Sequence, residues 1–151
     1  MLVREFMHSE PVTIPPGTPL LEAEWRMQEG GFRHLPIVDK HERLIGIVSD
    51  RDLREAAPSD ATSLSRQELS YLLSRLSVMD VMSSPVLTAR PAEPAEAAAI
   101  RMRENKIGAL PVVENDRLVG IVTTDDMLDA LVRMLQAQRG ADKAQETVER
   151  G

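Results

Sequence analysis

The sequence predicts an α+β fold made of two pseudo-symmetric β-α-β-β-α repeats that pack sheet to sheet. The first observation is an internal duplication, because Met7 and Leu35 recur 75 positions later as Met82 and Leu110. The second is that both copies present helix, strand and turn signals in the same order. A chain of 151 residues leaves each half too small to bury its own apolar face, so the copies are expected to share a core.

Each copy begins with a short strand-like segment, "PVTI" or "PVLTA". A Pro-bounded helix follows, "PLLEAEWRMQEGG" or "PAEAAAIRMRENK", and Gly30 and Gly31 end the first of these helices. A β-branched run, "LPIVD" or "LPVVE", is joined by a turn to "RLIGIV" or "RLVGIV". A new helix then begins at Ser49 or Thr123, which completes the unit.

These signals divide the chain into a first repeat at 1–57, a helical bridge at 58–77, a second repeat at 78–137 and a tail at 138–151. In the bridge, Ser65 stands three residues before Glu68, the spacing of a capping box, and leucines follow at helical spacing. The tail loses apolar periodicity and is predicted to be disordered.

The composition excludes several classes of protein. A net charge of −6 and a pI near 5.1 provide no basic face for a nucleic acid, and the absence of cysteine excludes disulfides and thiolate chemistry. No apolar segment approaches the roughly 20 residues needed to cross a bilayer, and charged residues interrupt the N-terminus where a signal peptide would need an apolar run. We therefore expect a cytoplasmic protein without nucleic acid or membrane partners.

The second β-branched run of each copy ends in a hydroxyl followed three places later by a carboxylate, Ser49 with Asp52 and Thr123 with Asp126. In one interpretation each pair caps a helix N-terminus, which stabilises the helix by about 1 kcal/mol. In the other, the free N–H groups and the hydroxyl receive a phosphate while the carboxylate accepts hydrogen bonds from ribose hydroxyls. The residues alone leave both interpretations open.

The duplicated pattern "LPIV…GIVSDRD" and "LPVV…GIVTTDD" resembles a tandem pair of CBS domains, the Bateman module, over nearly the whole chain. Together with "RHLPIVD" and the leucine-rich bridge, it is also similar to the acetoin-utilisation (AcuB-type) CBS proteins. This resemblance implies a regulatory, energy-sensing homodimer that binds AMP, ADP, ATP or S-adenosylmethionine between its repeats and signals occupancy to a partner protein. The AcuB-type likeness implies a role in acetoin metabolism. The alternative is a ligand-free scaffold in which the repeated motifs only cap helices.

The resemblance also assigns site residues, since in nucleotide-binding members the hydroxyl and carboxylate positions hold phosphate and ribose. The residues before "LP" of one repeat reach the carboxylate site of the other, so Arg33 and His34 belong with Asp126, and that site is the better equipped for phosphate. The residues assigned to nucleotide binding are Thr123, Asp126, Arg33, His34, Thr13, Ser49, Asp52, Thr88 and Arg51. Thr13 and Thr88 occupy positions that relatives place against adenine.

No catalytic constellation is expected. The three histidines, His8, His34 and His41, show neither metal-ligand spacing nor a partner serine in an elbow motif, and the chain has no P-loop or G-x-G-x-x-G. We therefore predict a protein that is not an enzyme and has no metal site and no cofactor.

A second apolar face is expected on the first helix of each copy. Leu21 and Trp25 lie opposite the core stripe, and Ile100 is the equivalent of Trp25 in the second copy. An apolar face echoed in both copies favours a dimer interface, which the resemblance to CBS pairs also implies. The alternative is that the bridge helix or the C-terminal helix covers it.

Overall fold

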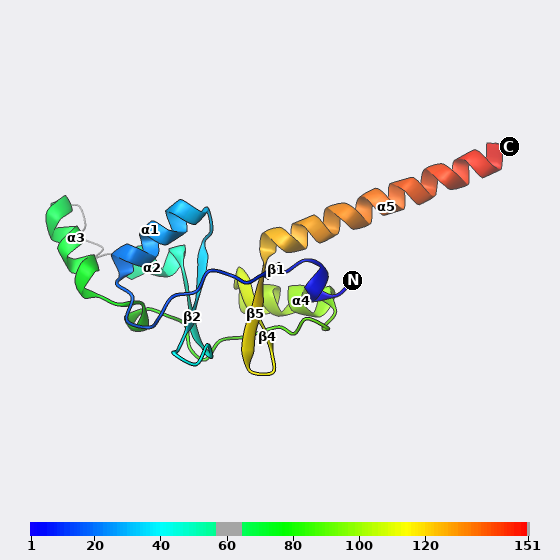
Figure 1. The fold of residues 1–151 in the computed structure, drawn as a ribbon. Helices are drawn as coiled ribbons and strands as arrows, with labels where there is room; N and C mark the ends of the chain where they lie inside the picture. Colours follow the sequence, from blue (N-terminus) through cyan, green and yellow to red (C-terminus); the bar gives the residue numbers. More distant parts are fainter. Residues whose placement is uncertain (57–64, 151) are drawn as a thin grey trace.

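The computed structural model of the protein describes residues 1–56 and 65–150. In chain order the elements are η1 (Val3–Glu5), β1 (His8–Ser9), α1 (Leu20–Gly30), β2 (His34–Val38), β3 (Leu44–Ser49), α2 (Asp50–Ala56), α3 (Arg66–Arg75), η3 (Val78–Asp80), α4 (Ala95–Asn105), β4 (Ala109–Glu114), β5 (Arg117–Thr123) and α5 (Thr124–Arg150). The β2–β3 and β4–β5 hairpins lie side by side at the centre of the molecule (Figure 1). The predicted α+β fold of two repeats is confirmed.

The two hairpins repeat each other down to their irregularities. Both are antiparallel, and each shifts register at one point, between Ile37 and Val38 and between Val112 and Val113. Only two residues with positive φ join β4 to β5, the geometry of a tight hairpin turn. In the first repeat the turn is longer, and the Asp39 carboxylate accepts hydrogen bonds from backbone N–H groups across it.

The first predicted strand of each repeat is reduced to a single bridging residue. Ile14 bridges β2 and Ala89 bridges β4, both in parallel orientation. Prolines surround these two positions in the sequence and cannot donate to a ladder, so pairing stops after one residue.

The N-terminal segments of the two repeats are exchanged. Val3 is buried in the core of the second repeat and its N–H donates to the Glu93 carbonyl at 2.9 Å, while β1 adds a strand to β5. Reciprocally, Val78 is buried in the core of the first repeat and its N–H donates to the Thr18 carbonyl at 2.9 Å. Each repeat is therefore completed by residues that precede the other one, an arrangement that the sequence analysis did not predict.

The exchange explains the two glycines that the duplication repeats. A Cβ on Gly46 would lie 2.4 Å from the Met82 sulfur, and one on Gly120 would lie 2.8 Å from the Met7 sulfur and 2.9 Å from the His8 carbonyl oxygen. Each glycine thus admits the methionine that the other repeat's leading segment delivers.

The helices α1 and α4 bury the predicted stripes and expose the predicted second face. Their buried residues are Leu20, Ala23 and Met27 in α1, and Ala95, Ala98 and Met102 in α4. Leu21, Trp25 and Ile100 are exposed, Trp25 to 59%. Neither α3 nor α5 covers Trp25 within one chain.

The described part of the bridge contains α3, and the C-terminal segment is helical up to Arg150. Residues 58–64 of the predicted bridge lie outside the described residues, and in α3 the Ser65 hydroxyl accepts from the Glu68 N–H at 3.1 Å, as the capping box predicts. The structure differs from the sequence analysis at 138–150, where α5 continues as an exposed helix that leaves the body of the molecule (Figure 1). Once the first turns of α5 are anchored, the Ala-, Gln- and Glu-rich segment extends it without a new nucleation cost.

Candidate functional site

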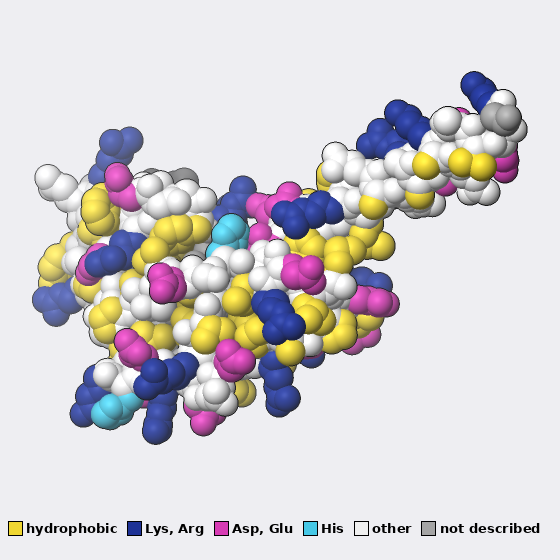
Figure 2. Space-filling view, turned by 45° about the vertical axis from the view of Figure 1, so that its right-hand side comes forward, with side chains coloured by type: hydrophobic (Ala, Val, Ile, Leu, Met, Phe, Trp, Pro, Cys, Tyr) yellow, Lys and Arg dark blue, Asp and Glu magenta, His cyan; other side chains and the backbone are white. Residues whose placement is uncertain are grey.

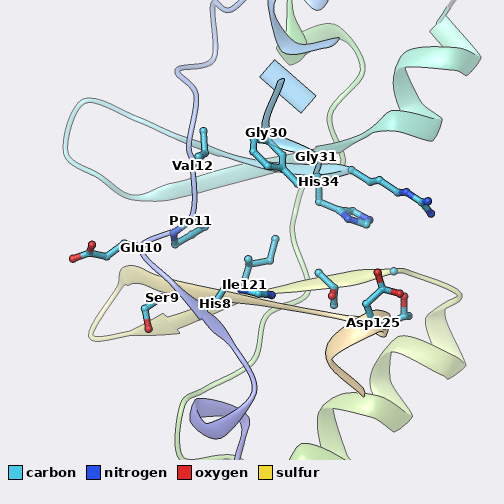
Figure 3. Close-up of a pocket in the computed structure, with 15 residues that line it drawn as sticks. His8, Ser9, Glu10, Pro11, Val12, Gly30, Gly31, His34, Ile121 and Asp125 are labelled. Atoms are coloured by element: carbon cyan, nitrogen blue, oxygen red, sulfur yellow. The ribbon is translucent and has the colours of Figure 1, made fainter. Parts of the chain in front are cut away.

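A cleft of about 540 Å³ lies between the two repeats. Three parts of the chain line it: residues 8–12, residues 30–34 and the second hairpin with the start of α5. Figure 3 shows His34 and Gly31 on one wall, His8 and Pro11 on the leading segment, and Asp125 on the opposite side. The volume falls within the usual range for small-molecule sites.

The first repeat supplies the basic wall from the segment that follows the end of α1. Gly31 adopts the left-handed conformation, with a φ of 68°, and its N–H donates to the Met27 carbonyl, which ends α1 and turns the chain toward β2. Arg33 and His34 follow at the cleft. A Cβ on Gly108 would lie 3.2 Å from His34 Nε2, so the small residue of the second repeat makes room for the imidazole of the first.

Burial lowers the pKa of His34 below its ordinary value of 6.5, although Asp50 and Asp52 act in the opposite direction. The imidazole is therefore neutral at neutral pH, and Arg33 supplies the permanent positive charge on this wall. A bound phosphate would favour the protonated imidazole.

The second repeat supplies a capped helix N-terminus. The Thr123 N–H and hydroxyl donate to Asp126 Oδ2 at 2.7 and 3.0 Å. In return, the Asp126 N–H donates to the Thr123 hydroxyl oxygen at 3.4 Å. Asp126 is buried, and its Oδ1 lies 3.0 Å from His8 Nε2. Thr123, Thr124 and Asp125 line the cleft, whereas Asp126 lies behind them.

The first repeat forms the same cap away from this cleft. The Ser49 N–H donates to Asp52 Oδ2 at 2.8 Å, and the Asp52 N–H donates to the Ser49 hydroxyl at 3.1 Å. Arg51 is exposed and pairs with Glu55 at 3.2 Å. None of these residues lines the cleft.

The two predicted adenine-facing threonines also lie outside the cleft. Thr88 lines a separate depression, and its carbonyl accepts a hydrogen bond from Arg101 at 2.8 Å. Thr13 lies directly after the cleft-lining residues 8–12 and does not line the cleft itself. The structure thus brings together Arg33, His34 and Thr123 of the predicted residues.

His8 and the backbone that follows it were missed by the sequence analysis. The signal was present, since Met7 and Gly120 are both landmarks of the duplication, but their contact across the repeats depends on the exchange of the leading segments. Among residues 1–56 and 65–150, no group of three potential metal ligands gathers, and no helix is long and apolar enough to cross a membrane.

Comparison with known families decides the identity of the fold. The family model of the CBS domain matches residues 3–59 and 78–133. The chain belongs to the CBS-domain family. Its two CBS domains correspond to the two repeats and include the leading segments that are exchanged.

Solved structures of CBS domain pairs share the overall fold of this chain. A protein of Vibrio cholerae assigned to acetoin utilization (AcuB) is 35% identical, with a TM-score of 0.75 over 93% of this chain and 96% of that chain. The CBS domain pair of protein MJ0100, in complex with 5′-methylthioadenosine and S-adenosyl-L-methionine, is 28% identical, with a TM-score of 0.76 over 89% and 98%. CBSX2 in complex with AMP is 29% identical, with a TM-score of 0.72 over 88% and 97%.

Some relatives of the CBS pair are much longer. The chain is 30% identical over 127 residues to the L-aspartate semialdehyde sulfurtransferase of Methanocaldococcus jannaschii. The alignment covers 83% of this chain but only 22% of that protein. The tandem CBS module is thus a part of those proteins.

Proposed function

We propose that the protein is a non-catalytic regulatory module that binds an adenine nucleotide or a related adenosyl ligand between its two CBS repeats. The observation that supports this proposal is the cleft itself, in which Arg33 and His34 of one repeat face the Thr123 cap of the other. Such a ligand touches both repeats, so binding changes their relative angle and reports occupancy to a partner. The adenosyl complexes of MJ0100 and CBSX2 support the ligand class.

Three groups of residues around the cleft contact three different parts of the ligand in this proposal. Arg33, His34 and the N-terminus of α5 take the phosphate or an equivalent polar group. The backbone of residues 9–12 takes the adenine edge, and Asp126 takes the ribose hydroxyls. Glu10 and Asp125 also line the cleft, and two acids beside one guanidinium favour a ligand with few phosphates, such as AMP or S-adenosylmethionine.

Ser49 and Asp52 form a second, weaker site in this proposal, with Arg51 and the segment near Thr88 as its remaining groups. The equivalents of Arg33 and His34 there are Gly108 and Ala109, which offer no charge. The site should hold a less charged ligand than the main cleft.

A second candidate function is a ligand-free scaffold. Ser49 with Asp52, and Thr123 with Asp126, form reciprocal helix caps. If the protein is a scaffold, capping is the only role of these four residues. Capping does not exclude binding, because a carboxylate has about four acceptor positions.

The exposed face of Leu21, Trp25 and Ile100 is proposed as the surface of a homodimer. The likeness to the Vibrio cholerae protein suggests regulation of acetoin metabolism in the cytoplasm, which genes adjacent to this one would test.

Isothermal titration calorimetry tests the ligand proposal. AMP, ADP, ATP, S-adenosylmethionine and, as a control, GMP are titrated into the wild type and into Arg33→Ala, Asp126→Ala and Asp52→Ala. A sensor binds one adenine ligand, and Arg33→Ala and Asp126→Ala weaken that binding at least tenfold, which corresponds to about 1.4 kcal/mol.

The matched Asp52→Ala variant separates capping from binding. Both aspartate variants should lose about 1 kcal/mol of stability with the cap, but only Asp126→Ala should lose the main site. If the folded wild-type protein binds none of these ligands, the scaffold reading stands and the sensor is excluded.

A further inference from the structure

The Asp126 carboxylate cannot be reached by a ligand in the conformation that the structure shows. Its side chain keeps 6% of its surface exposed, and Oδ2 already accepts from the Thr123 N–H and hydroxyl. Oδ1 lies 3.0 Å from His8 Nε2, and His8 lies at the surface of the cleft. A ribose hydroxyl that approaches from the cleft therefore meets His8 before it meets the carboxylate.

The His8 side chain is exposed to solvent apart from its contact with Asp126. It is 71% exposed, and it stands on β1, which is held by backbone pairing of His8 with Ile121. Rotation of the imidazole into solvent leaves this backbone pairing intact. The side chain can leave while the strand stays in place.

We propose that His8 is a gate on the Asp126 carboxylate, and that a ribose hydroxyl binds Asp126 Oδ1 only by displacing the imidazole. This inference rests on the proposed function, because it needs a ribose-bearing ligand in the cleft. His8 then lowers the affinity for every ligand with a ribose diol and leaves ligands without one unaffected. The carboxylate is kept hydrogen-bonded in the empty site, which avoids a buried unpaired charge.

The duplicate repeat offers the matched substitution. Ser83 aligns with His8 and bridges Ile47, which is the counterpart of Ile121, so serine is compatible with this backbone position. Its short side chain does not extend as far as an imidazole. His8→Ser is thus expected to fold and to uncover Asp126, and His41→Ser, in the exposed β2–β3 turn, serves as the control.

The test compares AMP with 2′,3′-dideoxy-AMP, which lacks both ribose hydroxyls, by titration calorimetry in one buffer. His8→Ser should bind AMP roughly five- to tenfold more tightly than the wild type, the fold-change expected for release of one hydrogen bond. Its affinity for the dideoxy nucleotide should be unchanged, and His41→Ser should match the wild type with both ligands.

Equal AMP affinity in His8→Ser and the wild type would overturn the gate while leaving the proposed function in place. Weaker AMP binding in His8→Ser would also overturn it, because His8 would then contact the ligand directly. AMP binding by His8→Ser alone would support the gate. If no variant and no wild-type protein bound either nucleotide, the proposed adenine-nucleotide function would fail and the gate with it.

Discussion

Two histidines face the same cleft, His34 from β2 and His8 from the leading segment that pairs with β5, and their surroundings separate their chemistry. His34 is partly buried against Gly108, and this burial lowers its pKa, so it is a neutral group that a phosphate can charge. His8 is largely exposed, and its Nε2 lies 3.0 Å from the buried Asp126 carboxylate. In the proposed site, His34 serves ligand recognition and His8 controls access to Asp126.

The lowered pKa of His34 predicts a specific dependence of stability on pH. The unfolded chain binds a proton at this residue near pH 6.5, whereas the folded protein binds it only at lower pH, so the free energy of unfolding falls as the pH drops below about 6.5. Urea unfolding between pH 8 and pH 5 should show this loss in the wild type and a smaller loss in His34→Gln. His41→Gln is the control, and equal slopes in the wild type and His34→Gln would contradict the prediction.

The two repeated glycines should differ in their tolerance of alanine. In Gly46→Ala the new methyl group meets the flexible Met82 side chain, which can rotate away, whereas in Gly120→Ala it also meets the His8 carbonyl, which is backbone. We expect Gly120→Ala to lose about 1 to 3 kcal/mol of unfolding free energy, as overpacked sites do, and Gly46→Ala to lose less. Chemical denaturation of the two variants measures their unfolding free energies. A larger loss in Gly46→Ala than in Gly120→Ala would contradict these contacts between the glycines and the exchanged leading segments.

At the scale of elements, α5 has two distinct halves. Met127 and Ala130 pack on the second repeat near Phe6, whereas the distal half makes no core contact with residues 1–56 or 65–150. The space-filling view shows apolar side chains gathered where the helix leaves the body (Figure 2). The proximal half is therefore structural, and the distal half is an extension that one copy of the chain does not stabilise by packing.

Truncation after Gln138 tests this division. Because the removed side chains are exposed, the free energy of unfolding should change by less than about 0.5 kcal/mol, while far-UV circular dichroism loses helical signal. A matched Ala130→Asp variant, which places a charge in the buried half, should be strongly destabilised. A large loss of stability on truncation would show that the distal half packs on another chain.

Most elements could be predicted from the sequence because their signals are local and occur twice. The end of α1 at Gly31 and the Ser65 cap of α3 depend only on residues close by in the sequence. The duplication repeats the same order of helices and strands along the chain, which supports the assignment of each element. The grouping of Arg33 and His34 with Thr123 also followed, through family resemblance. The contact of His8 with Asp126 did not, because it depends on which repeat the N-terminal segment packs against. Residues 138–150 are helical, whereas the sequence analysis predicted disorder from the lack of apolar periodicity. That segment continues a helix whose first turns are anchored, so it does not need an apolar stripe of its own.

For the whole molecule, the apolar surface of α1 and α4 is one of the faces that a single chain leaves exposed, and α5 carries another. Leu21, Trp25 and Ile100 are exposed although they sit on helices that bury their opposite faces well. Large exposed apolar residues at equivalent positions of both repeats, Trp25 and Ile100, favour an interface between copies.

Trp25→Glu tests the homodimer. If the proposed interface is correct, size-exclusion chromatography with light scattering should give a dimer for the wild type and a monomer for the variant, because a buried unpaired charge is costly. Glu22→Ala, a change on the same helix that removes a surface ion pair with Arg26, should remain dimeric. A wild-type monomer would exclude the interface.

The exchange of leading segments also constrains how the protein is made. As the ribosome releases the chain from its N-terminus, Val3 emerges first, yet the Glu93 carbonyl that it binds and the strand that β1 joins are synthesised much later. The first repeat likewise waits for Val78 before its core is closed. The first CBS domain is therefore complete on the nascent chain only when Val78 has been translated, and the leading segment that contains Val3 stays without its partner until the second hairpin follows.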